Sequence, residues 1–137
     1  MSTVGGMIDW KDVAPKFAGT AVAHLATVGR DGGPRSVPLW VDVVDETDLV
    51  FFTEAGAAKD KNIGHEPRVA LSVTDPANPL DMATVRGEVT ARLEGEAALV
   101  LVDRIAVKYT GEPYGVRTGL VAFVVRPTSW WAHDYAG

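Results

Sequence analysis

Runs of apolar and β-branched residues, separated by clusters of turn-forming residues, dominate this sequence of 137 residues. Runs with the length of strands follow one another with few helical segments between them. They span residues 20–28, 35–44, 49–53, 68–74, 82–93 and 119–131. A doubly wound sheet needs a regular alternation of strands and helices, so this order excludes one. The sequence therefore predicts a β-rich α+β protein, a small antiparallel barrel with helices at its ends.

The turns between the runs predict how the first strands connect. Glycine and proline concentrate at 29–34, and acidic turn formers fill 45–48. These turns predict a hairpin that a third strand extends into a meander. Gly87, inside the fifth run, predicts a β-bulge or a close approach of two backbones.

Three segments are predicted to be helical. Apolar residues repeat with helical spacing over 10–17, where Pro15 interrupts the pattern, and most clearly over 96–109. The polar and alanine-rich stretch 54–66 is typical of a helix or helical turn that links two strands. The length suits one domain, 1–137, with 1–7 as a loose N-terminal arm.

Composition excludes several classes of protein. The 13 lysines and arginines against 18 aspartates and glutamates give a net charge of −5, which argues against a general nucleic-acid binder. No apolar run approaches the roughly 20 residues that span a bilayer, and the first residues lack the features of a signal peptide. The absence of cysteine rules out disulfides and thiolate chemistry, and a cytoplasmic location is expected.

Common catalytic motifs are also missing. The three histidines have no metal-ligand spacing, so no metal site is expected. The serine elbow of hydrolases, the dinucleotide-binding glycine motif and the Walker loop are absent. His24 stands in a strand pattern, which is more typical of a core or interface histidine than of a catalyst.

One cluster of polar residues remains after these exclusions. Lys59, Lys61 and Asn62 follow the apolar run 49–53, at a junction between strand and helix. Free backbone N–H groups at a helix start and nearby ammonium groups favour a phosphate. On a regular helix Lys59 and Asn62 share a face, whereas Lys61 points elsewhere. Taken alone, these charges favour a solvated linker helix.

Five segments in order carry a resemblance to a known superfamily. They are ATVGRDG at 26–32, PRSVPLW at 34–40, KDKNI at 59–63, PRVAL at 67–71 and VRGEV at 85–89. In this order they resemble the pyridoxamine 5′-phosphate oxidase-like, FMN-binding split β-barrel superfamily, over about residues 8–132. Within that superfamily, DRI at 103–105 and KYTGEPY at 108–114 look like the actinobacterial branch of coenzyme F420-dependent oxidoreductases.

The resemblance implies a homodimer with two cofactor sites at the subunit interface. It implies that one strand runs beside the flavin or deazaflavin ring, namely Ser36, Val37, Pro38, Leu39 and Trp40. The segment from Lys59 to Asn62 would hold the phosphate. Pro38 agrees with this placement because it lacks the N–H of a ladder bond, although a proline that only blocks an edge is equally consistent. Trp130 and Trp131 are expected to close the site or the dimer, or to pack in the core.

One departure from the family bears on the cofactor. Family members that bind FMN commonly carry an arginine directly before the phosphate-site lysine, whereas this chain has Ala58. The loss of a guanidinium favours coenzyme F420 over FMN. Further cations for an anionic tail would be Arg35, Lys61 and Arg86.

The expected function is hydride transfer between the deazaflavin and an electron-poor C=C, C=N or quinone of a small molecule. Candidate proton donors are Tyr109, Tyr114 and His24, among which the sequence does not choose. The alternatives are an FMN-dependent oxidoreductase, a non-catalytic protein that stores a flavin-type cofactor, and a haem-handling split barrel, which the few histidines disfavour.

Overall fold

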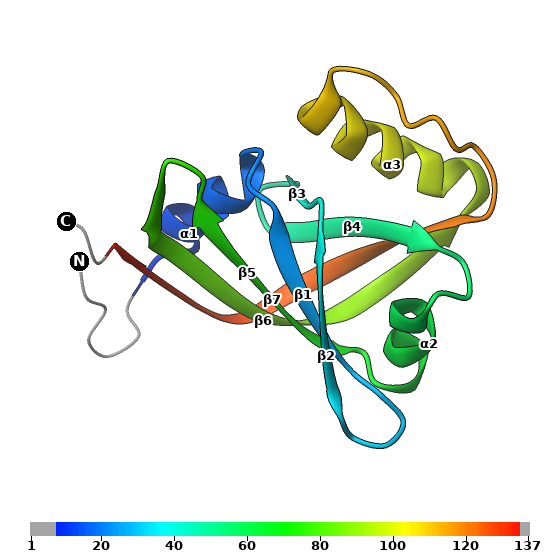
Figure 1. Ribbon diagram of the computed structural model, residues 1–137, viewed down its shortest axis with the longest axis horizontal. Coiled ribbons are helices and arrows are strands. Elements are labelled where there is room, and N and C mark those ends of the chain that lie inside the picture. Colours follow the sequence, from blue (N-terminus) through cyan, green and yellow to red (C-terminus); the bar gives the residue numbers. More distant parts are fainter. Residues whose placement is uncertain (1–7, 135–137) are drawn as a thin grey trace.

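The computed structural model describes residues 8–134, and the predicted N-terminal arm, 1–7, lies outside the described residues. These residues form a seven-stranded antiparallel sheet with three helices (Figure 1). The predicted class, a β-rich α+β split barrel, is therefore confirmed, with seven strands where about six were expected. None of the helices within 8–134 is long and apolar enough to cross a bilayer.

The elements follow one another as helix, four strands, helix, two strands, helix and strand. Their bounds are α1 Trp10–Ala18, β1 Ala23–Val28, β2 Pro34–Leu39, β3 Asp42–Val44, β4 Asp48–Glu54, α2 Ala58–His65, β5 Arg68–Asp75, β6 Asn78–Glu94, α3 Gly95–Thr110 and β7 Leu120–Asp134. All three predicted helices are present. Helix α2 begins later than predicted because the chain first turns at Gly56, whose φ is +82°.

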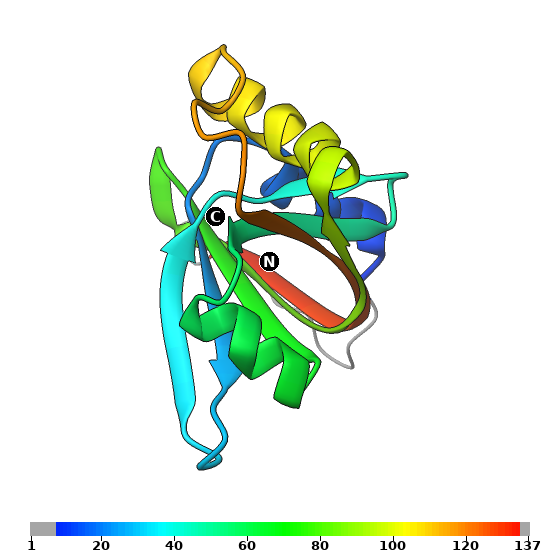
Figure 2. The same cartoon turned by 90° about the vertical axis from the view of Figure 1, so that its right-hand side faces the viewer.

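The order of strands in the sheet is β2-β1-β5-β6-β7-β4-β3, so β2 and β3 are its two edges. These edge strands are neighbours in sequence, since β2 ends at Leu39 and β3 begins at Asp42. Three residues reach about 10 Å. Seven strands spaced about 4.8 Å apart would be nearly 30 Å wide if the sheet were flat. The sheet must therefore curl until its edges approach each other, as Figure 2 shows.

The split between β2 and β3 corrects one prediction. A single strand over 35–44 was expected, followed by 49–53 in a meander. Instead β2 pairs with β1, and β3 pairs with β4 on the far edge of the sheet. The physical reason is at Val41, whose side chain is fully buried and whose N–H donates its hydrogen bond to the Tyr109 hydroxyl rather than to a neighbouring strand.

The core fills the inside of the curled sheet. It combines residues from both halves of the sheet with the buried face of α1, and includes Phe17, Leu25, Phe51, Leu71, Val85 and Phe123. Phe51 and Phe123 stack with their ring centroids 5.2 Å apart. Helices α2 and α3 lie outside the barrel, towards opposite ends in both views (Figures 1 and 2).

The predicted irregularity at Gly87 is confirmed by a register shift between Arg86 and Gly87 in the pairing of β6 with β7. A Cβ at Gly87 would lie 2.6 Å from the carbonyl oxygen of Arg126. The glycine is therefore required by the close approach of the two strands.

Candidate functional site

The start of α2 is fixed by a buried carboxylate. Asp60 accepts hydrogen bonds from Nε and Nη2 of Arg92, both at 2.8 Å, and from the backbone N–H of Gly56, also at 2.8 Å. The Arg92 guanidinium is the main cause that lowers the pKa of Asp60. Because Arg92 belongs to β6, this pair ties the first turn of α2 to the sheet. The predicted site residues Lys59 and Lys61 flank the fixed residue.

A cationic hollow of about 580 Å³ lies between the β1–β2 turn and α2. It is lined by Gly29, Arg30, Asp31, Gly33, Pro34, Arg35, Ala58, Lys61 and Asn62. Three of these side chains carry positive charge and only Asp31 carries negative charge. One Asp31 oxygen already accepts a hydrogen bond from the backbone N–H of Gly33, at 2.9 Å. The balance of charge in this hollow favours an anion.

Asn62 also holds α2 against β1. Its side-chain amide donates a hydrogen bond to the hydroxyl of Thr27, at 3.2 Å. One of the two amide N–H groups is therefore used within the protein, which leaves one donor and the carbonyl oxygen. A role for Asn62 in binding phosphate stays a prediction.

An aromatic hollow of about 320 Å³ lies at the other end of β2. It is lined by Leu39, Trp40, Phe52, Thr53, Glu54, Ala57, Lys59, Tyr114 and Leu120. One cation and one carboxylate border it, so its walls are close to neutral. Flat aromatic faces and few charges suit a planar ring system.

The Trp40 ring is supported from behind by Tyr109. The two rings stack with centroids 5.1 Å apart and planes 9° from parallel. The Tyr109 hydroxyl donates to the carbonyl of Ala21 at 2.6 Å, while Lys108 lies over the same ring and donates to the carbonyls of Val41 and Phe17. Burial raises the pKa of Tyr109 and lowers that of Lys108. These contacts make Tyr109 a structural support for Trp40.

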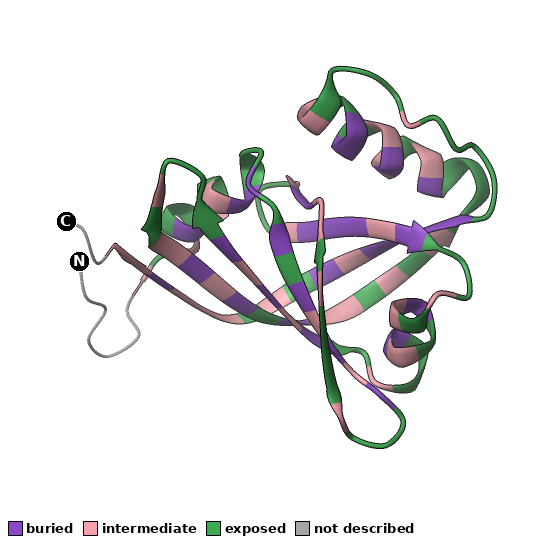
Figure 3. Ribbon diagram, in the orientation of Figure 1, coloured by how far each residue is buried: buried purple, intermediate pink, exposed green. Residues whose placement is uncertain are grey.

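Strand β2 connects the two hollows. Arg35 near its start lines the cationic hollow, and Leu39 at its end lines the aromatic hollow. Three strand residues lie between Arg35 and Leu39, so four steps along the strand separate these two residues, about 13 Å. The strand has a neighbour on one side only and is exposed along most of its length (Figure 3), which confirms the edge position expected for Pro38.

The strand residues between the hollows divide between two faces of the sheet. Ser36 and Pro38 pair with Ala26 and His24, on the outer face, whereas Val37 pairs with Leu25, which is buried. None of the three central residues lines either hollow.

The structure groups the predicted cations differently from the sequence analysis. Helical spacing predicted that Lys59 and Asn62 act together and that Lys61 points elsewhere. Instead Lys61 and Asn62 line the cationic hollow together with Arg35, and Lys59 lines the aromatic one. The reason is that the sheet covers one side of this short helix, so residues on its two flanks face different hollows.

Arg86 is separate from the other cations. It lines a third hollow of about 480 Å³ on the outer face of the sheet, where its Nε donates to the Ser129 hydroxyl at 3.1 Å. The sequence analysis did not include Arg30 among the candidate cations. Its place beside Gly29 in the turn-forming cluster could have indicated it, because side chains in such turns are exposed to a ligand.

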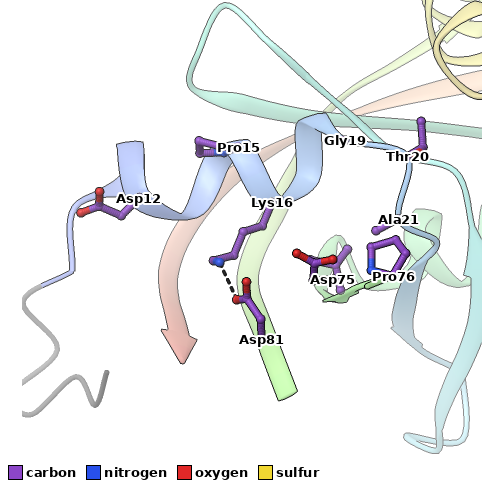
Figure 4. Close-up of a pocket in the computed structure, with 10 residues that line it drawn as sticks. Asp12, Pro15, Lys16, Gly19, Thr20, Ala21, Asp75, Pro76 and Asp81 are labelled. Atoms are coloured by element: carbon purple, nitrogen blue, oxygen red, sulfur yellow. Dashed lines mark hydrogen bonds and ion pairs between the residues drawn. The ribbon is translucent and has the colours of Figure 1, made fainter. Parts of the chain in front are cut away.

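A fourth hollow, between α1 and the β5–β6 turn, has the opposite charge (Figure 4). Asp12, Asp75 and Asp81 line it, and its lysine, Lys16, is paired with Asp81 at 2.6 Å. This excess of carboxylates disfavours an anionic ligand, so the cationic hollow suits a phosphate better.

The two C-terminal tryptophans have different surroundings. Trp130 packs against the core and meets the Trp10 ring edge-on, with ring centroids 5.1 Å apart. Its indole N–H donates a hydrogen bond to the carbonyl of Ile8, at 2.8 Å. Core packing is thus the role of Trp130. Trp131 stacks on His133 with ring centroids 5.6 Å apart.

Comparison with known proteins identifies the class to which this fold and site belong. The pyridoxamine 5′-phosphate oxidase family profile matches residues 11–134, and the chain belongs to this family. The pyridoxine/pyridoxamine 5′-phosphate oxidase of Pseudomonas paraeruginosa is 33% identical over 95 residues, which are 69% of this chain and 40% of that protein. The chain spans less than half the length of the curated relatives it matches.

Solved structures agree with the family. An F420 reductase is 32% identical, with a TM-score of 0.76, and the match covers 85% of this chain and 94% of that one. A conserved hypothetical protein of Mycobacterium tuberculosis shares the fold at 20% identity, with a TM-score of 0.79 and coverage of 98% and 89%. The family predicted from the sequence motifs is confirmed.

Proposed function

We propose that the protein is an oxidoreductase that binds coenzyme F420 and transfers a hydride between this deazaflavin and an electron-poor C=C, C=N or quinone of a small molecule. The observation that carries the proposal is the pair of hollows joined by β2, one cationic and one aromatic. The similarity to an F420 reductase supports it.

The residues present suit such a cofactor. A planar ring system would lie in the aromatic hollow, against the Trp40 face and beside the exposed backbone of β2. An anionic chain would reach the cationic hollow, where Arg35 and Lys61 bind it together with Arg30. Lys59, in the wall of the aromatic hollow, would donate hydrogen bonds to the ring end or to the phosphate.

A bound reduced deazaflavin supplies the hydride. The protein contributes position and a dry environment. Trp40, held by its stack on Tyr109, fixes one wall of the aromatic hollow, and Phe52 and Tyr114 exclude water from the other side. The ammonium group of Lys59 would orient an electron-rich oxygen of the bound molecule at the edge of the aromatic hollow.

FMN is the second candidate. Ala58 stands where FMN-binding members of the family commonly carry arginine, and it removes a two-point contact to a terminal phosphate. Three cations around one hollow suit a longer anionic tail better than a single phosphate.

A cytoplasmic location also stays a prediction.

A homodimer is part of the proposal. On the outer face, cross-strand neighbours form a row of mostly small side chains, Ser36, Ala26, Ala70, Arg86 and Ser129. A second copy would cover this row and the open edge of β2, and would close both ligand hollows from outside.

Fluorescence titration with F420 and with FMN tests the proposal. We expect F420 to bind more tightly than FMN, and the change Lys59→Ala or Lys61→Ala to weaken F420 binding by about fivefold each. The control is Lys11→Ala, because Lys11 is exposed on α1 and pairs with the exposed Asp9. Tight FMN binding without F420 binding, or unchanged affinity in both variants, would contradict the assignment.

Turnover separates an enzyme from a storage protein. Reduced F420 is mixed with the protein and a panel of quinones and tetrapyrroles, and its oxidation is followed by absorbance. Binding of F420 without oxidation by any acceptor would favour storage.

A further inference from the structure

Three side chains are candidates for the group that protonates a substrate, namely Tyr109, His24 and Tyr114. The Tyr109 hydroxyl donates to the carbonyl of Ala21 and lies behind Trp40. His24 lies on the outer face of β1, in register with Pro38. Only Tyr114 lines the aromatic hollow.

The backbone of Tyr114 is held at two points. Its N–H donates to Oδ1 of Asp103 on α3, at 3.1 Å, and its carbonyl accepts from Nη1 of Arg117, at 3.1 Å. Asp103 and Arg117 also pair with each other through two contacts, of 2.6 and 3.0 Å. The loop after α3 is thereby fastened to the helix on both sides of Tyr114.

The ring of Tyr114 is held as well, by two other residues of the hollow. It meets Phe52 edge-on at 4.9 Å and Trp40 edge-on at 6.3 Å. Within residues 8–134 the Tyr114 hydroxyl makes no hydrogen bond with the protein. A phenol that is fixed at its backbone and ring but not at its hydroxyl has its donor available to a ligand.

We propose that Tyr114 is the proton donor to a planar conjugated carbonyl compound, and that Asp103 and Arg117 are the residues that position it. This inference rests on the proposed function and names its substrate class. The aromatic walls select a flat conjugated molecule, and the phenol of Tyr114 and the ammonium of Lys59 donate to its carbonyl oxygens.

For a quinone, the reaction is a two-electron reduction to a hydroquinone. When bound, the reduced deazaflavin would supply a hydride, which is two electrons and one proton, to one carbonyl oxygen of the quinone and would thereby be oxidised. The O–H bond of Tyr114 breaks as the second proton passes to the quinone oxygen, and a hydroquinone forms. Water then returns a proton to the Tyr114 phenolate.

The first test compares Tyr114→Phe with the wild-type protein, with menadione as the acceptor and reduced F420 as the donor. Phenylalanine keeps the ring contacts, so the fold and the F420 affinity are expected to persist. We expect kcat to fall about 100-fold, with loss of the solvent isotope effect and a changed pH profile. Thr90→Val is the control, since it removes a hydroxyl that bonds a backbone carbonyl of β7. Wild-type kcat and pH profile in Tyr114→Phe would overturn the role of Tyr114.

A second test needs no turnover. Menadione is titrated into the protein without F420, and binding is followed by quenching of tryptophan fluorescence, to which Trp40 in the wall of the aromatic hollow contributes. We expect about fivefold weaker binding in Tyr114→Phe and in Arg117→Met, with rescue in Arg117→Lys. Absence of quenching in the wild-type protein would overturn the substrate class, and equal quenching in all variants would overturn the positioning role. Failure of the proposed function is distinguishable, because it appears as absence of F420 binding.

Discussion

Arg92 on β6 and Asp60 in the first turn of α2 form a two-point ion pair, with both N–O distances at 2.8 Å. The Asp60 side chain is 9% exposed and that of Arg92 is 38% exposed, so the carboxylate is the more buried partner. This pair joins the helix that carries Lys59 and Lys61 to the longest strand of the sheet. The geometry of both ligand hollows therefore depends on it.

Removing the charge of Asp60 should loosen this helix. Asp60→Asn keeps the size of the side chain but cannot accept both guanidinium contacts and the Gly56 N–H. We expect a loss of about 1–3 kcal/mol in the free energy of unfolding, measured by urea denaturation. Lys11→Ala, at an exposed pair, should leave stability unchanged. Equal stability of Asp60→Asn and wild type would show that the pair does not hold α2.

The same pair predicts a dependence of stability on pH. The pKa of Asp60 is lowered below its ordinary value of 3.8, chiefly by Arg92. A lowered pKa means that the carboxylate stabilises the fold above pH 3.8 and that this contribution is lost as the pH falls through the lowered value. The melting temperature of the wild-type protein should fall more steeply below pH 3.8 than that of Asp60→Asn. Parallel curves for the two proteins would contradict this assignment.

Two glycines should respond to alanine in opposite ways. At Gly87 a Cβ would lie 2.6 Å from the Arg126 carbonyl oxygen and 2.7 Å from a methyl group of Val125, so Gly87→Ala should destabilise the protein by about 1–3 kcal/mol. At Gly64, inside α2, a Cβ would meet nothing within 4 Å apart from its chain neighbours and the backbone of its own helix, so Gly64→Ala should stabilise the protein by about 0.5–1 kcal/mol. Thermal denaturation of both variants tests this contrast, and a stable Gly87→Ala protein would refute the close approach.

Most elements of the fold could be predicted because their patterns are local. Helix α3 has apolar residues at helical spacing over 96–109. The glycine at position 87 predicts the irregularity of β6 without reference to any other strand. The break between β2 and β3 has no such local signal, since 35–44 contains no glycine and is rich in the apolar and β-branched residues typical of one strand. It depends on the burial of Val41 and on the hydrogen bond that the Val41 N–H donates to the hydroxyl of Tyr109, which is 68 residues away in sequence.

The site was predictable in its residue types but not in its grouping. Lys59, Lys61 and Asn62 stand out as polar residues after a buried strand, and all three border a hollow. Helical phase alone paired Lys59 with Asn62, because it does not include the sheet that separates the two flanks of α2. Arg35 lies in the same hollow as Lys61 because the β1–β2 hairpin brings it there. Spacing along the chain does not predict this proximity.

A homodimer that covers the outer face should be sensitive to charge at its centre. Ala70 pairs with Ala26 on that face, so Ala70→Glu would place a carboxylate in the interface from each subunit. We expect dimer affinity to fall at least about tenfold by sedimentation equilibrium. Val100→Glu is the control, because Val100 is 69% exposed on α3. A monomeric wild-type protein, or an Ala70→Glu protein that dimerises normally, would contradict this interface.

Binding of an anionic cofactor should depend on salt, through the cationic hollow. The cationic hollow is lined by Arg30, Arg35 and Lys61. When the salt concentration rises from about 0.1 M to about 1 M, the Debye length falls from about 10 Å to about 3 Å, so the attraction between exposed charges is strongly screened. We expect F420 affinity to fall over this range in the wild-type protein. The double variant Arg35→Ala/Lys61→Ala should bind more weakly at low salt and show a flatter dependence, because fewer charges remain to be screened. Lys11→Ala is the control, since Lys11 is an exposed cation on α1 that pairs with Asp9 and does not line the cationic hollow. If the double variant and the wild-type protein have the same salt dependence, the anionic end of the cofactor does not lie in the cationic hollow.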